Sequence, residues 1–232
     1  MRLFYWIAIN GIYAAANKIP NLIGSFYSVF NLAWTETASR CSEDKDKEQY
    51  YSKLYEVILD FLILCACFIL ASSDLIFKLL IDSKFYEGYY QMPILILGVI
   101  FNCLVSFYGG IYIALKKTKE VGVSSAIGAI LNIVINVLAI KHIGIFAASV
   151  STVVSFAIIC IYRRIKLNDF IALDYSLPKE LIDLIVVTFC MVVFYIKIPF
   201  SNIVLYLVAF IFLAYFMHKY CKVFFRNIKK KS

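Results

Sequence analysis

The sequence predicts an all-α integral membrane protein with about seven transmembrane helices. Of its 232 residues, 62% are hydrophobic, and the mean hydropathy is +0.83. Only 16% of the residues are charged, whereas soluble domains average about 25%. Several apolar stretches also reach the roughly 20 residues that cross a bilayer core as a helix. A soluble fold is therefore excluded.

Seven candidate spans follow one another along the chain. They are Gly11–Thr37, Leu54–Ala71, Met92–Leu115, Val121–Ile140, Ile145–Tyr162, Leu181–Ile196 and Ile203–Met217. The connector Asp74–Tyr90 is partly amphipathic, and its tyrosines suit the headgroup region, so we expect it to lie along the membrane surface. Pro199 in the segment Lys197–Asn202 predicts a tight hairpin between the last two spans.

The distribution of Lys and Arg predicts the orientation. Most of the 23 basic residues fall after the first, third and fifth spans and in the C-terminal tail. Cytoplasmic loops carry such an excess, so we expect a multi-pass protein with a cytoplasmic C-terminus. The net charge of +8 then indicates contact with anionic membrane lipids, and no nucleic acid partner is expected.

The first span carries a polar stripe whose members are alternately four and three residues apart. They are Asn17, Asn21, Gly24, Ser28, Asn31 and Thr35. This spacing places them on one helical face, and exposure of such a polar face to lipid costs free energy. It predicts either the wall of a water-filled cavity or a helix interface with amide hydrogen bonds. Lys18 and Glu36 flank the stripe near its two ends.

Later spans carry small residues at the same spacing. Ser124, Gly128, Asn132 and Asn136 are four residues apart, as are Ala147, Ser151 and Ser155. Such faces let membrane helices approach closely, which predicts packing, with Asn132 and Asn136 as the candidates for a cavity. Gly109-Gly110 is interpreted either as a packing contact or as a flexible or kinked point.

Catalytic residues, metal ligands and cofactors are not expected. Cys65 and Cys67 are close in sequence, but the chain has no CxxC pair, and most cysteines fall within apolar spans. The two histidines, His142 and His218, are far apart. A membrane enzyme would need clustered catalytic residues, so the sequence argues against an enzyme.

Three segments together resemble a known family. They are Gly11–Pro20 (GIYAAANKIP) with Asn31–Trp34 (NLAW), then Met92–Thr118 ending in YGGIYIALKKT, and Ile127–Asn132 continuing through Gly144 to Ser155. They resemble the second half of the bacterial O-antigen and oligosaccharide-lipid flippases, polysaccharide exporters of the MATE-like multidrug/oligosaccharidyl-lipid/polysaccharide exporter superfamily. The resemblance covers about residues 10 to 165. Lys141-His142 departs from it, since a proline and a basic residue are common there.

The resemblance implies two six-helix lobes around a central cavity, often with two extra helices. Residues 1–164 would then be an incomplete C-terminal lobe, and residues 165–232 the terminal helix pair with a basic cytoplasmic tail. The first lobe would be missing, and so would the helix that opens the second lobe unless Leu3–Ile9 is its stub. We therefore expect a truncated gene product, a misplaced start, or one part of a split transporter whose partner is the missing N-terminal lobe.

The implied function is polysaccharide export. The protein would flip an undecaprenyl-pyrophosphate-linked oligosaccharide across the bacterial inner membrane by alternating access between two lobes. One lobe would form a single wall of the cavity, so we expect no transport by this chain alone. The cavity candidates are Asn17, Lys18, Asn21, Ser28, Asn31, Thr35, Glu36, Asn132 and Asn136.

Two alternatives remain. A multidrug or cation exporter of the same fold would couple to ions through buried carboxylates. Glu36, Asp60 and Asp183 approach that role, but all lie near predicted helix ends. A membrane enzyme of polysaccharide assembly, such as a polymerase, would typically carry a large external loop, and the outer connector of about 17 residues between the second and third spans is too short for one.

Overall fold

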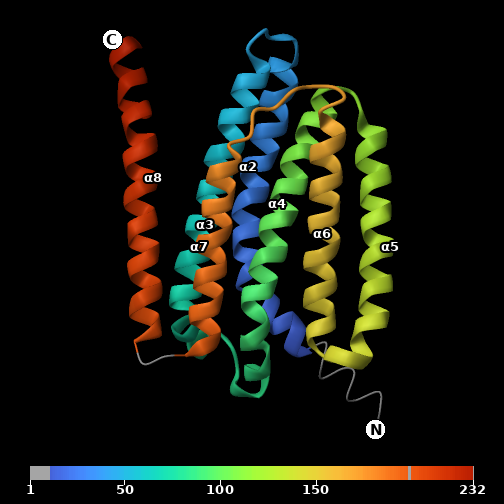
Figure 1. Cartoon of the computed structure of the whole chain (residues 1–232), viewed down its shortest axis with the longest axis vertical. Coiled ribbons are helices and arrows are strands. Elements are labelled where there is room, and N and C mark those ends of the chain that lie inside the picture. Colours follow the sequence, from blue (N-terminus) through green and yellow to red (C-terminus); the bar gives the residue numbers. More distant parts are fainter. Residues whose placement is uncertain (1–10, 198–199, 232) are drawn as a thin grey trace. The chain divides into compact units, whose positions relative to one another are not determined.

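The protein is helical throughout the part that the computed structural model describes, residues 11–197 and 200–231, without the side chains of 83–84 and 221–231 (Figure 1). The predicted stub Leu3–Ile9 lies outside these residues. Two 3-10 helices, η1 (Cys41–Glu43) and η2 (Ser83–Gln91), accompany the longer helices. The latter are α2 (Pro20–Arg40), α3 (Lys47–Leu80), α4 (Met92–Ala114), α5 (Thr118–Ile143), α6 (Phe146–Leu167), α7 (Leu177–Ile196) and α8 (Ser201–Lys231).

The predicted fold class, an all-α membrane protein, is confirmed, although the count of spans differs. Five helical stretches of the described chain are long and apolar enough to cross a bilayer: Lys47–Leu80, Phe85–Ala114, Thr118–Ile143, Phe146–Leu167 and Ser201–Tyr220. α2 falls short because of its polar face, and α7 because Lys179, Glu180 and Asp183 lie in its first two turns.

The first predicted span, Gly11–Thr37, is divided in the structure. Residues 11–17 are helical, a turn follows at Lys18 and Ile19, and α2 starts at Pro20. Proline has no backbone N–H, and its ring excludes the carbonyl four residues earlier, so it is tolerated in a first helical turn rather than an interior. The stripe residue Asn17 therefore lies on the segment before the break.

The chain divides into two compact units, and the first comprises residues up to Glu56 together with Phe77–Tyr175. Within it, α4 packs against α2 and against α6, while α5 packs on α6 (Figure 1). Phe107, Tyr108, Ile111 and Tyr112 of α4 are wholly buried. The outer helix α5 exposes large apolar side chains, which suits a surface in contact with lipid: Ile130, Ile133, Val137 and Leu138.

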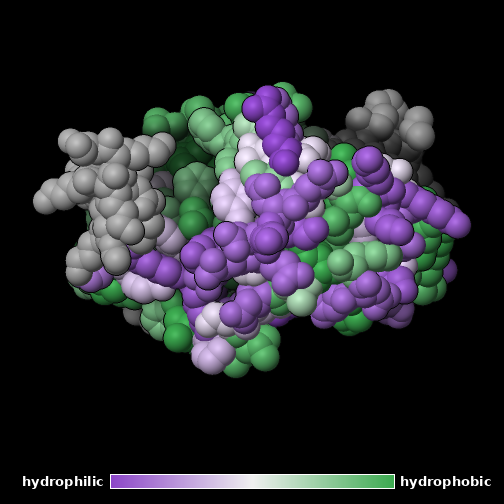
Figure 2. Space-filling view, turned by 90° about the horizontal axis from the view of Figure 1, so that it is seen from above, coloured by the Kyte–Doolittle hydropathy of each residue, from purple (hydrophilic) through white to green (hydrophobic). Residues whose placement is uncertain are grey.

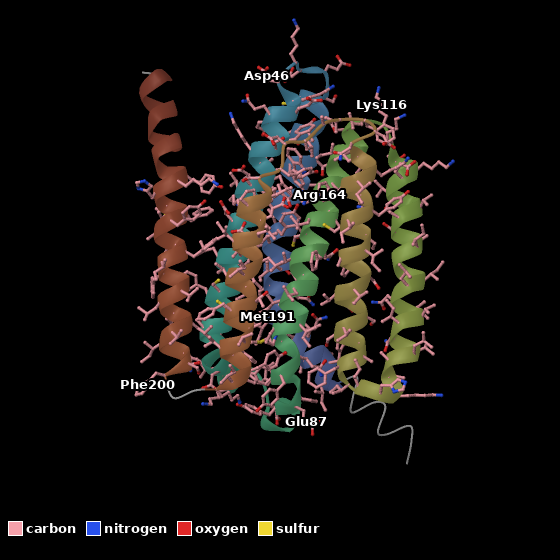
Figure 3. The ribbon with its side chains drawn as sticks, in the orientation of Figure 1. Asp46, Glu87, Lys116, Arg164, Met191 and Phe200 are labelled. Atoms are coloured by element: carbon pink, nitrogen blue, oxygen red, sulfur yellow. The ribbon has the colours of Figure 1, made fainter. Side chains whose placement is uncertain are left out.

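The connections of the first unit alternate between its two ends. Asp46 and Lys116 lie at one end of the helices, and Glu87 lies at the opposite end (Figure 3). Hydrophilic side chains gather on the end that carries Asp46 and Lys116 (Figure 2). The α2–α3 and α4–α5 connections therefore share one end, as the helix order in the sequence predicts.

The second unit comprises Val57–Ile76 and residues from Ser176 onward. α7 packs against α8. The middle of α3 contacts both of them, with the Cys67 and Cys190 sulfurs 3.8 Å apart and the Phe68 and Phe210 ring centroids 5.5 Å apart. Part of the predicted α7–α8 hairpin, residues 198–199, lies outside the described chain.

Candidate functional site

A cavity of about 630 Å³, whose lining mixes polar and apolar residues, lies within the first unit between α2, α4, α5 and α6. Its size falls in the range of small-molecule sites. Hydroxyl, amide and guanidinium groups from all four helices line it: Asn31, Thr35, Asn102, Ser106, Ser125, Asn132, Ser155 and Arg163. Arg163 is the charged member among the described residues of this lining.

The side chain of Arg163 is buried, with 3% of the residue exposed, and reaches from α6 to α4 and α5. Nη1 donates to the Val105 carbonyl at 2.7 Å. On α5, Nε donates to Ser124 Oγ at 2.9 Å, while Nη2 donates to the Val121 carbonyl at 3.1 Å and to Ser125 Oγ at 2.9 Å. These acceptors are neutral, so they position the guanidinium without neutralising its charge.

Two glycines of α4 make room at this site. A Cβ on Gly109 would lie 3.1 Å from Nη1 of Arg163, and a Cβ on Gly110 would lie 2.8 Å from Nε1 of Trp34. α4 runs without interruption from Met92 to Ala114. The absence of a Cβ at both glycines therefore serves close packing, as one of the two sequence interpretations predicts.

Trp34 fixes α2 against α4 beside the cavity. Its ring stacks on Phe107 with centroids 4.9 Å apart, and its Nε1 donates to the Phe107 carbonyl at 3.4 Å. Tyr51, at the start of α3, meets the Trp34 ring edge-on and donates to the Ala38 carbonyl at 2.8 Å. Asn31 and Thr35, on either side of Trp34 in sequence, line the cavity.

The predicted stripe is thus divided between different surroundings. Asn31 and Thr35 line the cavity, while Asn21 and Ser28 are exposed, and Ser28 donates to the Ser25 carbonyl. Of the other two stripe residues, Asn17 lies before the break, and a Cβ on Gly24 would lie 3.8 Å from Val99 Cγ1. The two flanking residues lie elsewhere: Lys18 lines a separate hollow of about 280 Å³, and Glu36 forms an exposed ion pair with Arg40.

Of the two candidate asparagines of α5, Asn132 lines the cavity and donates to Thr152 Oγ1 at 3.4 Å. Asn136, one turn further, is not part of the lining. Which of the predicted residues contact a substrate stays a prediction.

Sequence reasoning missed Arg163 as a cavity residue, because it grouped Arg163 with Arg164 and Lys166 as loop charges. A signal was present, since Ser151, Ser155 and Arg163 are separated by multiples of four residues. That spacing extends the small-residue face of α6 to Arg163.

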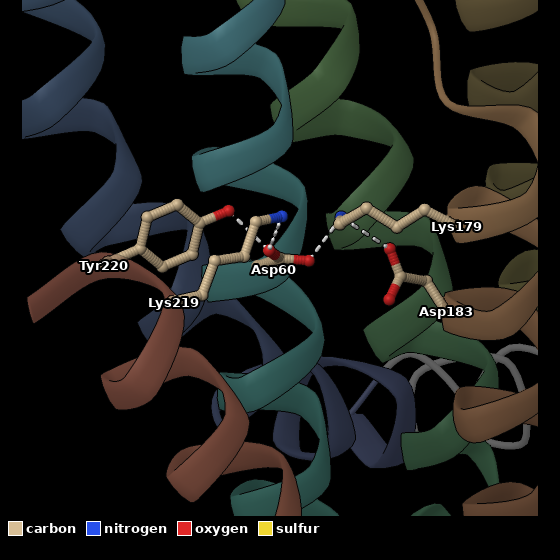
Figure 4. A network of polar contacts seen from close by, with 5 residues as sticks. All are labelled: Asp60, Lys179, Asp183, Lys219 and Tyr220. Atoms are coloured by element: carbon tan, nitrogen blue, oxygen red, sulfur yellow. Dashed lines mark hydrogen bonds and ion pairs between the residues drawn. The ribbon is translucent and has the colours of Figure 1, made fainter. Parts of the chain in front are cut away.

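A second polar cluster joins three helices of the second unit (Figure 4). Asp60 of α3 is wholly buried and accepts from Lys179 of α7 and from Lys219 and Tyr220 of α8. Lys179 also pairs with Asp183 at 3.1 Å. Two carboxylates therefore face two ammonium groups. Asp60 was predicted near a helix end, whereas α3 starts 13 residues before it, at Lys47.

Across the described residues, no group of three or more His, Cys, Asp or Glu side chains could hold a metal ion.

Comparison with known proteins points to one fold. No family model matches the sequence, and no curated protein matches it either. Among solved structures, one similar fold is "Lipid II flippase MurJ, inward closed conformation", with a TM-score of 0.63 and 15% sequence identity. The chain therefore has a fold similar to that of this protein. The similarity covers 94% of this chain and 48% of the MurJ chain, so this chain spans about half of MurJ's length.

This similarity confirms the predicted fold in its general form. The identity is too low to carry over a substrate. The finer resemblance to O-antigen exporters stays a prediction.

Proposed function

We propose that this chain is one lobe of a flippase that moves an undecaprenyl-pyrophosphate-linked oligosaccharide across the bacterial inner membrane. The MurJ-like fold carries the proposal, because the protein of similar fold is named as a flippase of a lipid-linked substrate. The cavity supports it, since hydroxyls and amides suit a sugar and one buried guanidinium suits a phosphate.

Transport would require a second lobe. In alternating access, two halves rock about a site between them, and this chain spans about half of the similar MurJ chain. An N-terminal lobe is proposed as the partner of this one, and the C-terminus is proposed to be cytoplasmic. The proposed protein is a transporter rather than an enzyme.

The alternative, a multidrug or cation exporter of the same fold, would use an uncompensated buried carboxylate. Asp60 and Asp183 are both paired with lysine, and the described cavity lining contains no carboxylate. The charge of the cavity therefore favours an anionic cargo over a cationic one.

Binding and translocation assays test the proposal. The purified chain should bind undecaprenyl-pyrophosphate-linked oligosaccharide more tightly than a lipophilic cation such as tetraphenylphosphonium. In liposomes, the chain alone should leave the oligosaccharide on its original side, judged by access of an added glycosidase. Addition of a matching N-terminal lobe should start translocation. Preferential binding of the cation would overturn the proposal and support the exporter alternative.

A further inference from the structure

Within the described part of the chain, Arg163 forms no ion pair with a carboxylate. Each acceptor that the described chain supplies to this side chain is a carbonyl or hydroxyl oxygen. A buried cation within a membrane protein normally pairs with an anion, because its desolvation is costly. A bound anion would supply the missing charge.

One N–H group of Arg163 is available for such an anion. A guanidinium has five N–H donors, and the hydrogen bonds of the described structure account for one on Nε, one on Nη1 and two on Nη2. The fifth belongs to Nη1, which lies beside Gly109. Because Gly109 also lines the cavity and has no side chain, it leaves Nη1 uncovered on that side.

A second polar group on α6 also lacks a partner. Ser155 is 3% exposed, lines the same cavity, and its Oγ makes no hydrogen bond in the structure. Buried hydroxyls are nearly always hydrogen-bonded, so this one indicates a group that the protein does not itself supply. The neighbouring serine, Ser151, instead donates to the Ala148 carbonyl at 3.0 Å.

The spacing of these two groups limits the ligand. Eight residues separate Ser155 from Arg163, which is about 12 Å along a helix axis. The arginine side chain covers part of that distance, because helical side chains lean toward the N-terminus. A ligand in contact with both is longer than a lone phosphate and carries a polar group attached to it.

We propose that this cavity binds the phosphate-bearing headgroup of a lipid, with a phosphate at Arg163 and the attached polar group at Ser155. Guanidinium groups bind phosphate oxygens through strong charge-assisted hydrogen bonds. The inference rests on the proposed function for the identity of the lipid, since a phospholipid headgroup has the same chemistry. The assignment of Arg163 and Ser155 is independent of that identity.

Lipid binding to the purified 232-residue chain in detergent tests whether the phosphate is recognised. The probes are undecaprenyl pyrophosphate against undecaprenol, and phosphatidylglycerol against diacylglycerol, measured by native mass spectrometry. At least one phosphate-bearing lipid should bind about tenfold or more tightly than its phosphate-free counterpart. Equal binding within both pairs overturns the proposal, and this comparison needs no variant.

Two variants with matched controls test the residues. Arg163→Gln should abolish the preference for phosphate, whereas Arg164→Gln should keep it, because Arg164 lies over the Tyr175 ring rather than in the cavity lining. Ser155→Ala should weaken binding of undecaprenyl pyrophosphate that carries a sugar by about tenfold and leave sugar-free undecaprenyl pyrophosphate unchanged. Ser151→Ala should change neither. A preference that survives Arg163→Gln overturns the assignment.

The outcomes separate this inference from the proposed function. Arg163-dependent binding of phosphatidylglycerol without binding of undecaprenyl lipids supports the phosphate site and contradicts the flippase proposal. Tight binding of the lipid-linked sugar that depends on neither Arg163 nor the phosphate supports the flippase proposal and contradicts the phosphate site. If Arg163→Gln fails to fold, the affinities of the wild-type chain for the four lipids still test the phosphate site. The comparison of Ser155→Ala with Ser151→Ala still tests the site of the attached polar group.

Discussion

Nη1 of Arg163 lies 3.1 Å from the position that a Cβ atom on Gly109 would occupy. On the next residue, Gly110, a Cβ would lie 2.8 Å from Nε1 of Trp34. Adjacent glycines thus admit a cation from α6 on one side of α4 and an indole from α2 on the other. This close approach joins α2, α4 and α6 beside the cavity.

We expect Gly110→Ala to destabilise the protein by about 1–3 kcal/mol, the usual cost of overpacking a core. Trp34 cannot move away easily, because it stacks on Phe107 and meets Tyr51. The matched control is Gly122→Ala in α5, where a Cβ meets nothing within 4 Å, so the better helix propensity of alanine should stabilise slightly. Thermal unfolding in detergent, followed by circular dichroism, measures both. Equal melting temperatures would contradict the packing account.

The hydroxyl of Tyr51 is expected to stabilise the α2–α3 connection. Tyr51→Phe removes its hydrogen bond to the Ala38 carbonyl at a fully buried position, which should cost about 1 kcal/mol. Tyr50→Phe is the control, since Tyr50 is 41% exposed and the substitution should change stability by less than about 0.5 kcal/mol. The same unfolding measurement compares the two. A larger effect at Tyr50 would contradict the assigned geometry.

The long helices could be predicted from sequence because hydropathy alone requires them. The start of α4 at Met92 was predicted exactly where it lies, and its predicted end, Leu115, is one residue beyond the observed one. The break before Pro20 was missed, since hydropathy continues across it and a proline in a membrane helix often causes only a kink. α3 begins earlier than predicted because its first turns are polar but still helical.

The cavity could be predicted only in part. A period near 3.6 residues places Asn31 and Thr35 on one face, yet periodicity does not show which part of a face meets a neighbouring helix. The positions of two further polar side chains depend on partners distant in sequence. Arg163 donates to the carbonyls of Val105 and Val121, and Asp60 pairs with Lys179. Such contacts come from tertiary packing, which a single sequence does not display.

Asp60→Asn is expected to weaken the second unit strongly. It leaves Lys179 and Lys219 beside a neutral amide, and removal of one partner of a buried ion pair typically costs about 3–5 kcal/mol. The double variant Asp60→Asn/Lys219→Met should recover part of this loss, because it also removes one of the two ammonium groups that faced Asp60. Asp169→Asn, which breaks the exposed pair with Lys166, should have no measurable effect. Urea titration followed by the α-helical circular dichroism signal measures the free energy of unfolding of each variant. Equal losses for Asp60→Asn and Asp169→Asn would be inconsistent with the buried network.

The two ends of the first unit should lie on opposite sides of the membrane. Single cysteines at Asp46 and Lys116, introduced into a cysteine-free protein, should react with an impermeant maleimide from the same side. A cysteine at Glu87 should react from the other side. Because basic loops favour the cytoplasm, labelling of intact cells should reach the Glu87 position and spare the other two. Labelling of the Asp46 position alone would reverse the proposed orientation.

Oxidation should join Cys67 to Cys190 within the second unit. Their sulfurs lie 3.8 Å apart, so a small movement permits a disulfide, with two protons released and two electrons passed to an added copper–phenanthroline oxidant. A non-reducing peptide map should show one linked pair and a mass loss of about 2 Da, the two hydrogens removed. Cys67→Ser should abolish the link. Cys65→Ser should preserve it, because Cys65 is only two residues away but points to a different face of α3. Linkage through Cys65 in the wild-type chain would mean that α3 is rotated relative to α7 in solution.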